Sequence, residues 1–262
     1  MSSSLLHALH LRLIWFYCMW AATVPVTVLL RRRLVRRGSA ALPLAPALSP
    51  PSPKYMSTKG APLVRSAEML RKCRSGTSDI DLTRFVAAAK QFDEVMAPFG
   101  LYSKVMVLAT REQLEYLQKA PAAARSTARA LLLHEKASGK HTRRPQELVD
   151  GSPAIALLWM RRGFEFWLGT FEQHVSRPRS FSEECWRGYL ATSAKFNGWM
   201  MRKLAAANHK LAPPWETICA RGLCSEVQLK AQLKAWCAAV RPVIDRLTAL
   251  HREAGLDDLR LV

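Results

Sequence analysis

Apolar residues from Val64 to the carboxy terminus recur at the three- and four-residue spacing of one face of an α-helix. This pattern predicts helices over the ranges 66–74, 82–92, 102–117, 122–136, 152–174, 182–211 and 225–254. Asp79 or Asp81 is placed to cap the second helix, and Pro242 predicts a kink or break in the last. No alternating run rich in Val and Thr predicts a strand. The fold class is therefore predicted to be all-α, with about eight helices in two layers around one core.

An uncharged apolar run of 18 residues, from Leu13 to Leu30, precedes this helical pattern. The run is at the lower limit for spanning a bilayer, and the basic cluster at 31–37 follows it. Positive charge on that side of a span favours a cytosolic location for the rest of the chain. Two alternatives remain open: an organelle transit peptide, and a gene-model extension for which Met56 is the true start.

Composition divides the chain into three parts. Residues 1–37 are the membrane anchor or targeting segment, and residues 38–64 have the Pro- and Ala-rich composition of an extended linker. Residues 65–262 carry the helical pattern and are predicted to form the folded domain. This domain is expected at the cytosolic face of a membrane or in the cytoplasm, with or without the anchor.

Net charge indicates an anionic partner. The sequence has 39 Lys and Arg against 20 Asp and Glu, a formal charge of +19. Eight of the basic residues and none of the acidic ones lie in 1–64, which leaves 31 basic and 20 acidic residues in the remainder. Such a surface favours membrane headgroups or nucleic acid. Because no motif that reads a nucleic-acid groove is present, we expect an anionic membrane surface and no nucleic acid.

The cysteines and histidines predict neither a metal site nor an enzyme. No CxxC pair occurs, and the five-residue offset between Cys219 and Cys224 is not a ligand signature. We expect free thiols in a reducing compartment. His174 and His209 have no acid and nucleophile arranged beside them, so no catalytic residue and no cofactor is predicted. The six cysteines are Cys18, Cys73, Cys185, Cys219, Cys224 and Cys237.

Two stretches, in the same order and spacing, resemble the glycolipid transfer protein family. Ser152–Val175 reads SPAIALLWMRRGFEFWLGTFEQHV and is similar to the family's central helix, which carries an Ala-Leu-x-Trp-Leu-Lys-Arg-Gly-Leu-x-Phe core. Ala194–Pro213 reads AKFNGWMMRKLAAANHKLAP and resembles the family's Lys-Tyr-His-Gly-Trp run with its closing Ala-Pro. HEKASG at His134–Gly139 and AGLDDL at Ala254–Leu259 are weaker matches. The resemblance covers roughly residues 65–262.

The resemblance implies a two-layer helical sandwich that encloses an apolar tunnel for lipid chains, with a headgroup site at its mouth. For each residue that could line this tunnel, the alternative is that it is an ordinary core residue. The candidates are Leu131, Leu132, Leu133, Phe164, Phe166, Trp167, Phe171, Phe196 and Met200.

The headgroup site implied by the family falls on the central helix. Trp159 matches the Trp that stacks on the first sugar of a glycolipid, since an indole face suits the apolar face of a hexose. Arg162, and with it Arg161, offers planar donors for phosphate or sugar oxygens. The alternative for this basic pair is an ion pair with Glu165 at a helical offset.

Two departures from the family pattern affect specificity. Asn197 stands where the family has the His that bonds the sphingoid amide carbonyl, although an Asn amide also donates. The family's Asp, which holds the amide N–H, falls in a stretch without Asp, where Glu112 and Gln113 are the only candidates. We therefore expect a remodelled amide clamp and relaxed preference for sphingolipids.

The resulting hypothesis is a protein that binds and transfers a two-chain lipid between membranes without chemistry. The expected ligand is a glycosphingolipid, ceramide-1-phosphate or another two-chain lipid. Trp215, beside Pro213 and Pro214, is predicted to contact the membrane, as a side chain does at that place in family members. The alternative is a membrane-tethered lipid sensor or presenter with altered or lost sphingolipid specificity.

Overall fold

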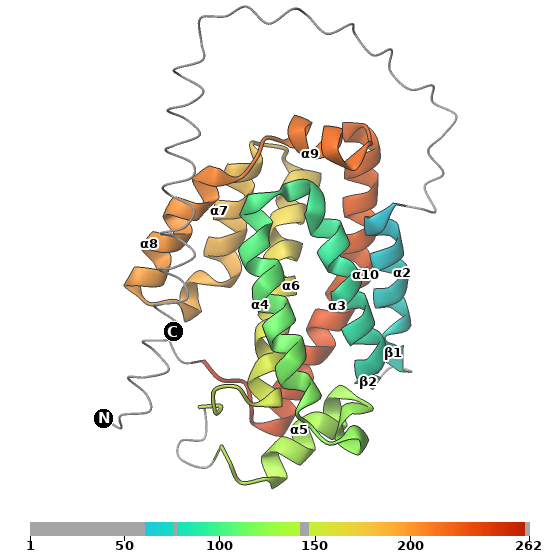
Figure 1. The fold of residues 1–262 in the computed structure, drawn as a ribbon, viewed down its shortest axis with the longest axis vertical. Coiled ribbons are helices and arrows are strands. Elements are labelled where there is room, and N and C mark those ends of the chain that lie inside the picture. The colour runs from blue at the N-terminus through green and yellow to red at the C-terminus, as the bar shows by residue number, and fades with distance from the viewer. Residues whose placement is uncertain (1–60, 76–77, 142–146, 260–262) are drawn as a thin grey trace, which may run out of the picture. The chain divides into compact units, whose positions relative to one another are not determined.

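The computed structural model describes residues 61–75, 78–141 and 147–259. The predicted anchor at 1–37 and most of the linker lie outside these residues. The α-helices in the described part (Figure 1) are α2 (Pro62–Lys72), α3 (Leu82–Met96), α4 (Leu101–Gln118), α5 (Ala128–Ala137), α6 (Pro153–Ser176), α7 (Phe181–Thr192), α8 (Trp199–Asn208), α9 (Trp215–Gly222) and α10 (Glu226–Ala254). Short elements join them: β1 (Arg74–Ser75), β2 (Asp79–Ile80), and the 3₁₀ turns η3 (Ala97–Phe99), η4 (Ala122–Arg125), η5 (Ala194–Phe196) and η6 (His209–Leu211). None of the helices described combines the length and hydropathy needed to cross a membrane.

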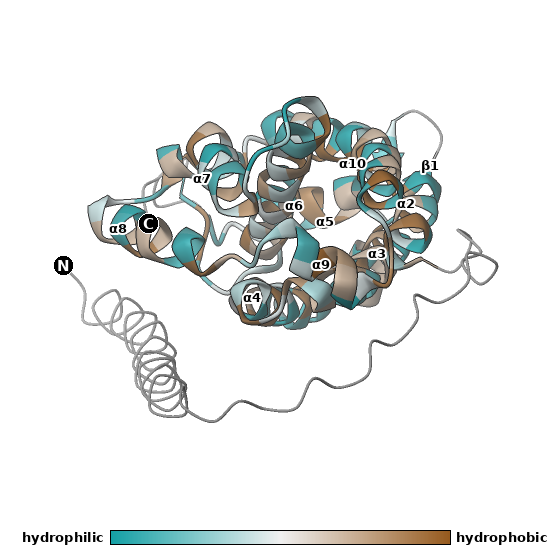
Figure 2. Ribbon diagram, turned by 90° about the horizontal axis from the view of Figure 1, so that it is seen from above, coloured by the Kyte–Doolittle hydropathy of each residue, from teal (hydrophilic) through white to brown (hydrophobic). Residues whose placement is uncertain are grey.

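The helices form two layers, as Figures 1 and 2 show. In one layer α7, α6, α10 and α2 pack side by side in that order. In the other, α4 lies across α6 and α3 lies across α2. The prediction of a two-layer all-α domain is therefore confirmed.

Helix α6 is the central element of the core. Sixteen of its 24 residues are buried, and Ser152 caps its first turn by accepting from the Ile155 amide. Helix α7 packs against it closely at Gly188, where an added Cβ would lie 2.4 Å from the Thr170 hydroxyl oxygen. The interior between the layers is rich in aromatic rings whose neighbouring centroids lie 5–6 Å apart, a spacing typical of packed aromatics. These rings are Phe85, Phe92, Phe99, Phe164, Trp167, Phe171, Phe181, Trp215 and Trp236.

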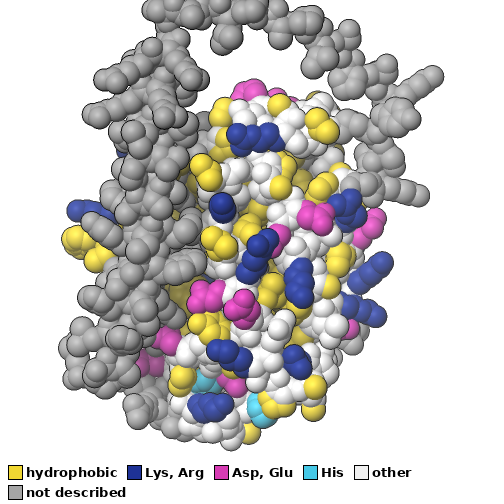
Figure 3. Space-filling model, in the orientation of Figure 1, with side chains coloured by type: hydrophobic (Ala, Val, Ile, Leu, Met, Phe, Trp, Pro, Cys, Tyr) yellow, Lys and Arg dark blue, Asp and Glu magenta, His cyan; other side chains and the backbone are white. Residues whose placement is uncertain are grey.

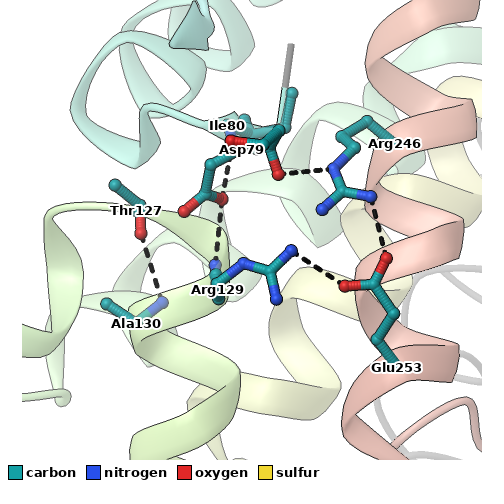
Figure 4. A network of polar contacts seen from close by, with 8 residues as sticks. Asp79, Ile80, Thr127, Arg129, Ala130, Arg246 and Glu253 are labelled. Carbon is teal, nitrogen blue, oxygen red and sulfur yellow. Dashed lines mark hydrogen bonds and ion pairs between the residues drawn. The ribbon is translucent and has the colours of Figure 1, made fainter. Parts of the chain in front are cut away.

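A two-stranded hairpin, β1–β2, follows α2 and departs from the prediction of no strand. Asp79 at its end accepts from the Arg129 amide at 3.1 Å, which ties it to α5. On α10, Arg246 donates to the Ser78 carbonyl at 2.7 Å. Figure 4 shows that Arg129 and Arg246 also converge on Glu253, each at 2.9 Å. Strands of two residues are too short to show an alternating pattern in the sequence. Polar contacts with residues distant in the chain stabilise the hairpin.

The predicted helix at 182–211 is wrong in its length, because the chain is broken between α7 and α8. Asn197 is extended, with φ −109° and ψ 129°, and Gly198 caps α8 from a similar conformation. The break is stabilised by Arg202, whose Nε donates to the carbonyls of Ala194 at 3.1 Å and Asn197 at 2.9 Å. At Pro242, by contrast, α10 continues without a break.

Candidate functional site

The first feature of the site is the Arg162 side chain, which lies between two aromatic rings. Its guanidinium carbon is 3.5 Å from the centroid of the Phe196 ring and 4.9 Å from that of the Trp159 ring. Phe196 belongs to η5, and Trp159 lies one helical turn before Arg162 on α6. The broken segment between α7 and α8 thereby brings Phe196 to the part of α6 that carries Arg162. Trp159 itself is half-buried and packs against the core.

The two arginines are tied to the carboxy-terminal segment. Arg161 forms a buried ion pair with Asp257 at 2.9 Å, and Arg162 donates to the backbone carbonyl of Asp258. The Asp258 carboxylate in turn accepts from the Leu148 amide at 2.8 Å. The alternative partner proposed from sequence, Glu165, is therefore replaced by an acid 96 residues away in the chain.

Several donors of this arginine pair make no hydrogen bond within the described residues. They are Nε and Nη1 of Arg161 and Nε of Arg162, all buried. Burial, and then the charge of Arg161, lower the pKa of Arg162 to about 10, so it stays cationic at neutral pH. Buried donors without partners are costly, so this cationic cluster is suited to bind an anionic or hydroxyl-rich group.

Asn197 follows Phe196 in the chain, and its side chain has a partner of its own. Its amide nitrogen donates to the Tyr189 hydroxyl at 3.0 Å, and it is half-buried. Tyr189 stacks on Trp186 with a centroid distance of 5.4 Å. A lipid carbonyl would therefore compete with Tyr189 for the Asn197 amide.

The two candidates on α4 do not join the cluster. Glu112 is exposed and accepts from the Tyr116 hydroxyl one turn later, at 3.0 Å. Gln113 is half-buried. Within the described residues, neither side chain has a hydrogen bond to Trp159, Arg162 or Asn197. Of the predicted site residues, the structure thus places Arg162 against Trp159, with Phe196 on its other side.

The predicted tunnel lining is interior at seven of nine positions. Leu133 on α5 and Met200 on α8 are 53% and 46% exposed, so the assignment of these two to a tunnel is wrong. Leu133 lies on the outer face of its helix, where Leu131 and Leu132 face inward. The other buried candidates are Leu131, Leu132, Phe164, Phe166, Trp167, Phe171 and Phe196.

Trp215 is placed differently from the sequence prediction of a membrane contact. Its side chain is only 6% exposed, and its ring centroid lies 3.9 Å from that of His174. The indole N–H donates to Glu184 at 2.7 Å. Glu184 is fully buried, and it also bonds His174 Nδ1 at 3.0 Å and the Arg179 amide at 2.8 Å. In this structure Trp215 therefore belongs to the core and is not exposed for the membrane contact predicted from sequence.

Among the described residues, the exposed large aromatic side chain is that of Trp199, at the start of α8. Its side chain is 67% exposed, and the Lys203 ammonium lies 4.5 Å from the ring centroid. No residue of α8 is buried, and Met200 and Leu211 are also exposed on this segment. More widely, Figure 3 shows basic side chains spread over one face of the molecule with apolar ones between them. We define the docking surface as Trp199, Met200, Lys203 and Leu211.

Sequence reasoning did not identify the tail acids as neighbours of the arginine pair, or Trp199 as an exposed residue. Asp257 and Asp258 form an acidic pair in a basic chain, and this was the available signal for partners of Arg161 and Arg162. For Trp199 the signal was the run Gly-Trp-Met-Met, in which consecutive large apolar residues cannot all face inward on one helix.

Comparison with known proteins agrees with this architecture. The family described as Glycolipid transfer protein (GLTP) matches residues 80–221. No curated protein sequence matches the chain. Mouse ceramide-1-phosphate transfer protein, in its apo form, superposes with a TM-score of 0.68 at 15% identity, over 75% of this chain and 99% of that chain.

Two further solved structures are similar. A mutant of Arabidopsis ACD11 (accelerated-cell-death 11) in complex with ceramide-1-phosphate has a TM-score of 0.65 at 18% identity, over 75% of this chain and 98% of its own. FAPP2, described as selecting simple glycosphingolipids with the GLTP fold, has a TM-score of 0.67 at 18% identity, over 77% of this chain and 100% of its own. At these identities the likeness shows a shared fold.

Proposed function

Because this chain belongs to the glycolipid transfer protein family, a family of lipid transfer proteins and not of enzymes, we propose that it binds a two-chain amphipathic lipid and moves it between membranes. The lipid is a sphingolipid with a sugar or phosphate headgroup, or a closely related two-chain lipid. Its headgroup binds around Trp159 and Arg162, and its chains enter between the helical layers. The reaction involves binding and release only.

The observation that supports this assignment best is the position of the Arg162 guanidinium between Phe196 and Trp159. The two rings hold the guanidinium in one plane. The side chain therefore loses less rotamer entropy when a ligand binds than an unrestrained arginine would. Nε of Arg162, and Nε and Nη1 of Arg161, have no hydrogen-bond partner within the described residues and are donors for phosphate or sugar oxygens. The half-buried indole of Trp159 supplies an apolar face beside them.

The aromatic interior is suited to the lipid chains. Each methylene that leaves water contributes about 0.8 kcal/mol, so the chains supply most of the affinity and the headgroup site selects among lipids. Because Asn197 is engaged with Tyr189 and Glu112 with Tyr116, the contacts to a sphingoid amide are weak. We therefore expect other two-chain lipids to compete.

We propose that the docking surface places the protein on anionic bilayers. An exposed indole beside a lysine is suited to the headgroup region, where the ring is buried and the cation meets lipid phosphates. This surface takes the role that sequence reasoning assigned to Trp215. Exposed Arg187, which is paired with Glu183 on α7, provides a charge control outside it.

Transfer of fluorescent lipids between vesicles tests the proposal. We expect transfer of galactosylceramide and of ceramide-1-phosphate above a no-protein control. Trp159→Ala should reduce transfer of the sugar lipid more than that of the phosphate lipid, and Arg162→Gln should do the reverse. Arg187→Ala should change neither. Equal losses for both lipids in both variants, with folding intact by circular dichroism, would refute the headgroup assignment.

A second variant sharpens the amide assignment. Asn197→His restores the residue type found in the family run, and should increase the preference for ceramide-1-phosphate over phosphatidic acid, a glycerol-based competitor. An unchanged preference would mean that the lipid amide does not lie at residue 197.

A further inference from the structure

The turn that ends α9 brings Cys219 and Cys224 together. Leu223 has φ 51°, a left-handed conformation, and its amide hydrogen-bonds to the Cys219 carbonyl. The Cys224 amide bonds to the same carbonyl at 3.2 Å. Such a helix cap commonly brings the side chains on either side of the turn into contact, usually as a small apolar pair. Here both positions are cysteines.

The two thiols interact with each other. Each thiol influences the pKa of the other, so the two side chains are neighbours. Burial and the Cys224 thiol raise the pKa of Cys219 to about 11, and burial also raises the pKa of Cys224. Both residues are free cysteines.

This pair is also the most accessible of the described cysteines. Cys219 and Cys224 are partly exposed, whereas the other three described cysteines are buried. Both line a cavity of about 420 Å³, together with His174, Arg179 and Ser225. A small reagent that enters this cavity meets both cysteine residues. The buried cysteines are Cys73, Cys185 and Cys237.

We propose that Cys219 and Cys224 form a dithiol–disulfide site that is oxidised by a low-molecular-weight disulfide. One cysteine thiolate attacks a sulfur of the reagent, its S–S bond breaks, and one reagent thiol leaves with a proton. The second cysteine then attacks the mixed disulfide on the protein sulfur and releases the second reagent thiol. The two cysteines lose two electrons and two protons, and the reagent disulfide gains them as two thiols. This site is independent of the headgroup assignment.

Thiol chemistry sets the properties of the site. The raised pKa values leave little thiolate at neutral pH, so oxidation is slow there and accelerates as pH rises. A disulfide is a strong oxidant when the protein stabilises the thiolate of its reduced form. These thiols are not stabilised as thiolates, so the disulfide, once formed, is a weak oxidant. Its formation closes the left-handed turn at Leu223 covalently. Arg221 in that turn donates to the Pro98 carbonyl at 3.2 Å, so the link also stabilises the contact of α9 with η3.

Peptide mapping of the full chain after treatment with glutathione disulfide tests the proposal. Trypsin cleaves after Arg221, between the two cysteines, and yields peptides 211–221 and 222–230. We expect these two peptides to be joined, with a mass two hydrogens below their sum. Because folding positions the thiols, half-oxidation should require about tenfold less glutathione disulfide in buffer than in urea.

Two variants serve as controls. Cys224→Ser should abolish the joined peptides, while Leu223→Gly, which removes the strained conformation but keeps both thiols, should retain them. Glutathione adducts on both cysteines without a link between them would overturn the proposal. Equal oxidation in buffer and in urea, or disulfides between two chains, would overturn it as well.

Discussion

Trp199 and Trp215 lie 16 residues apart, at the starts of α8 and α9, and have opposite environments. Both begin a short helix after a break in the chain. Trp199 is 67% exposed and has Lys203 over its ring, whereas Trp215 is 6% exposed and donates to a buried carboxylate. The difference comes from what faces each indole. Glu184 on α7 provides an acceptor and His174 a stacking surface for Trp215.

The comparison shows that proximity to prolines does not determine whether a tryptophan is exposed. Burial of an indole is favoured where its N–H finds an acceptor, since an unpaired buried donor costs about 1–3 kcal/mol. Trp215 has such an acceptor, and within the described contacts Trp199 has only a cation over its ring. Trp215 therefore serves stability, and Trp199 is available for a membrane.

Replacing Trp215 by Ala should have the largest effect on stability. The change removes a core ring, one hydrogen bond to Glu184 and the ring that packs on His174, so we expect a loss of about 3–5 kcal/mol in the free energy of unfolding. Urea denaturation followed by circular dichroism measures it. Trp199→Ala, in the same assay, should change stability by less than about 0.5 kcal/mol. Similar losses of unfolding free energy in the two variants would contradict the assignment of Trp215 to the core and of Trp199 to the surface.

Replacing Trp199 by Ala should have the largest effect on membrane binding. A large apolar side chain moved from water into a bilayer contributes about 1.5–3 kcal/mol, so vesicle affinity should fall roughly tenfold to a hundredfold. Cosedimentation with vesicles that contain phosphatidylserine measures this affinity. Leu101→Ala, at an exposed leucine of α4 outside the docking surface, is the matched control and should bind normally. If both variants bind equally well, α8 is not the docking element.

Glu184→Gln tests whether the buried carboxylate holds Trp215. The amide retains the shape but offers only one acceptor oxygen for the three donors now bound by Glu184, so we expect a loss of about 1–3 kcal/mol in stability. Vesicle affinity below the unfolding transition should not change. An increase in affinity would show that released Trp215 can reach the membrane, and would bring back its predicted contact.

Lys203→Ala should have the smallest effect. One lysine near an anionic surface contributes about 1 kcal/mol, a change of about fivefold in affinity that high salt should remove. Lys234→Ala, a lysine on exposed α10 surface, should have a weaker effect. The vesicle assay at two salt concentrations measures both. A loss that persists at high salt would mean that Lys203 acts by orienting Trp199.

Local sequence signals predicted most of the helices, since each depends on neighbours within a few residues. Asp81 caps α3 as expected, by accepting from the Arg84 amide at 3.0 Å, and the apolar spacing of α6 matches its burial. The break at Asn197 was missed because Arg202, which satisfies the freed carbonyls, reaches back across it. A helical residue pattern does not reveal that contact.

The site was predictable in part, because residue types indicate chemistry but not partners. Trp159 and Arg162 were identified from their motif, and the structure places them together. The partner of Arg161 was sought one helical turn away, whereas Asp257 lies in the tail. Trp215 was misplaced for the same reason, since its acceptor Glu184 is 31 residues earlier in the chain.

The lack of buried residues in α8 has a consequence for its amide hydrogens. A helix of ten residues is marginal in water unless packing supports it, and α8 has no buried side chain to provide that support. It should therefore open without unfolding of the whole domain, and its amides should exchange with deuterium far sooner than those of α6. On a vesicle that covers Trp199, α8 should become protected while the rate in α6 stays the same. We therefore expect folding of this helix to be coupled to contact with the bilayer.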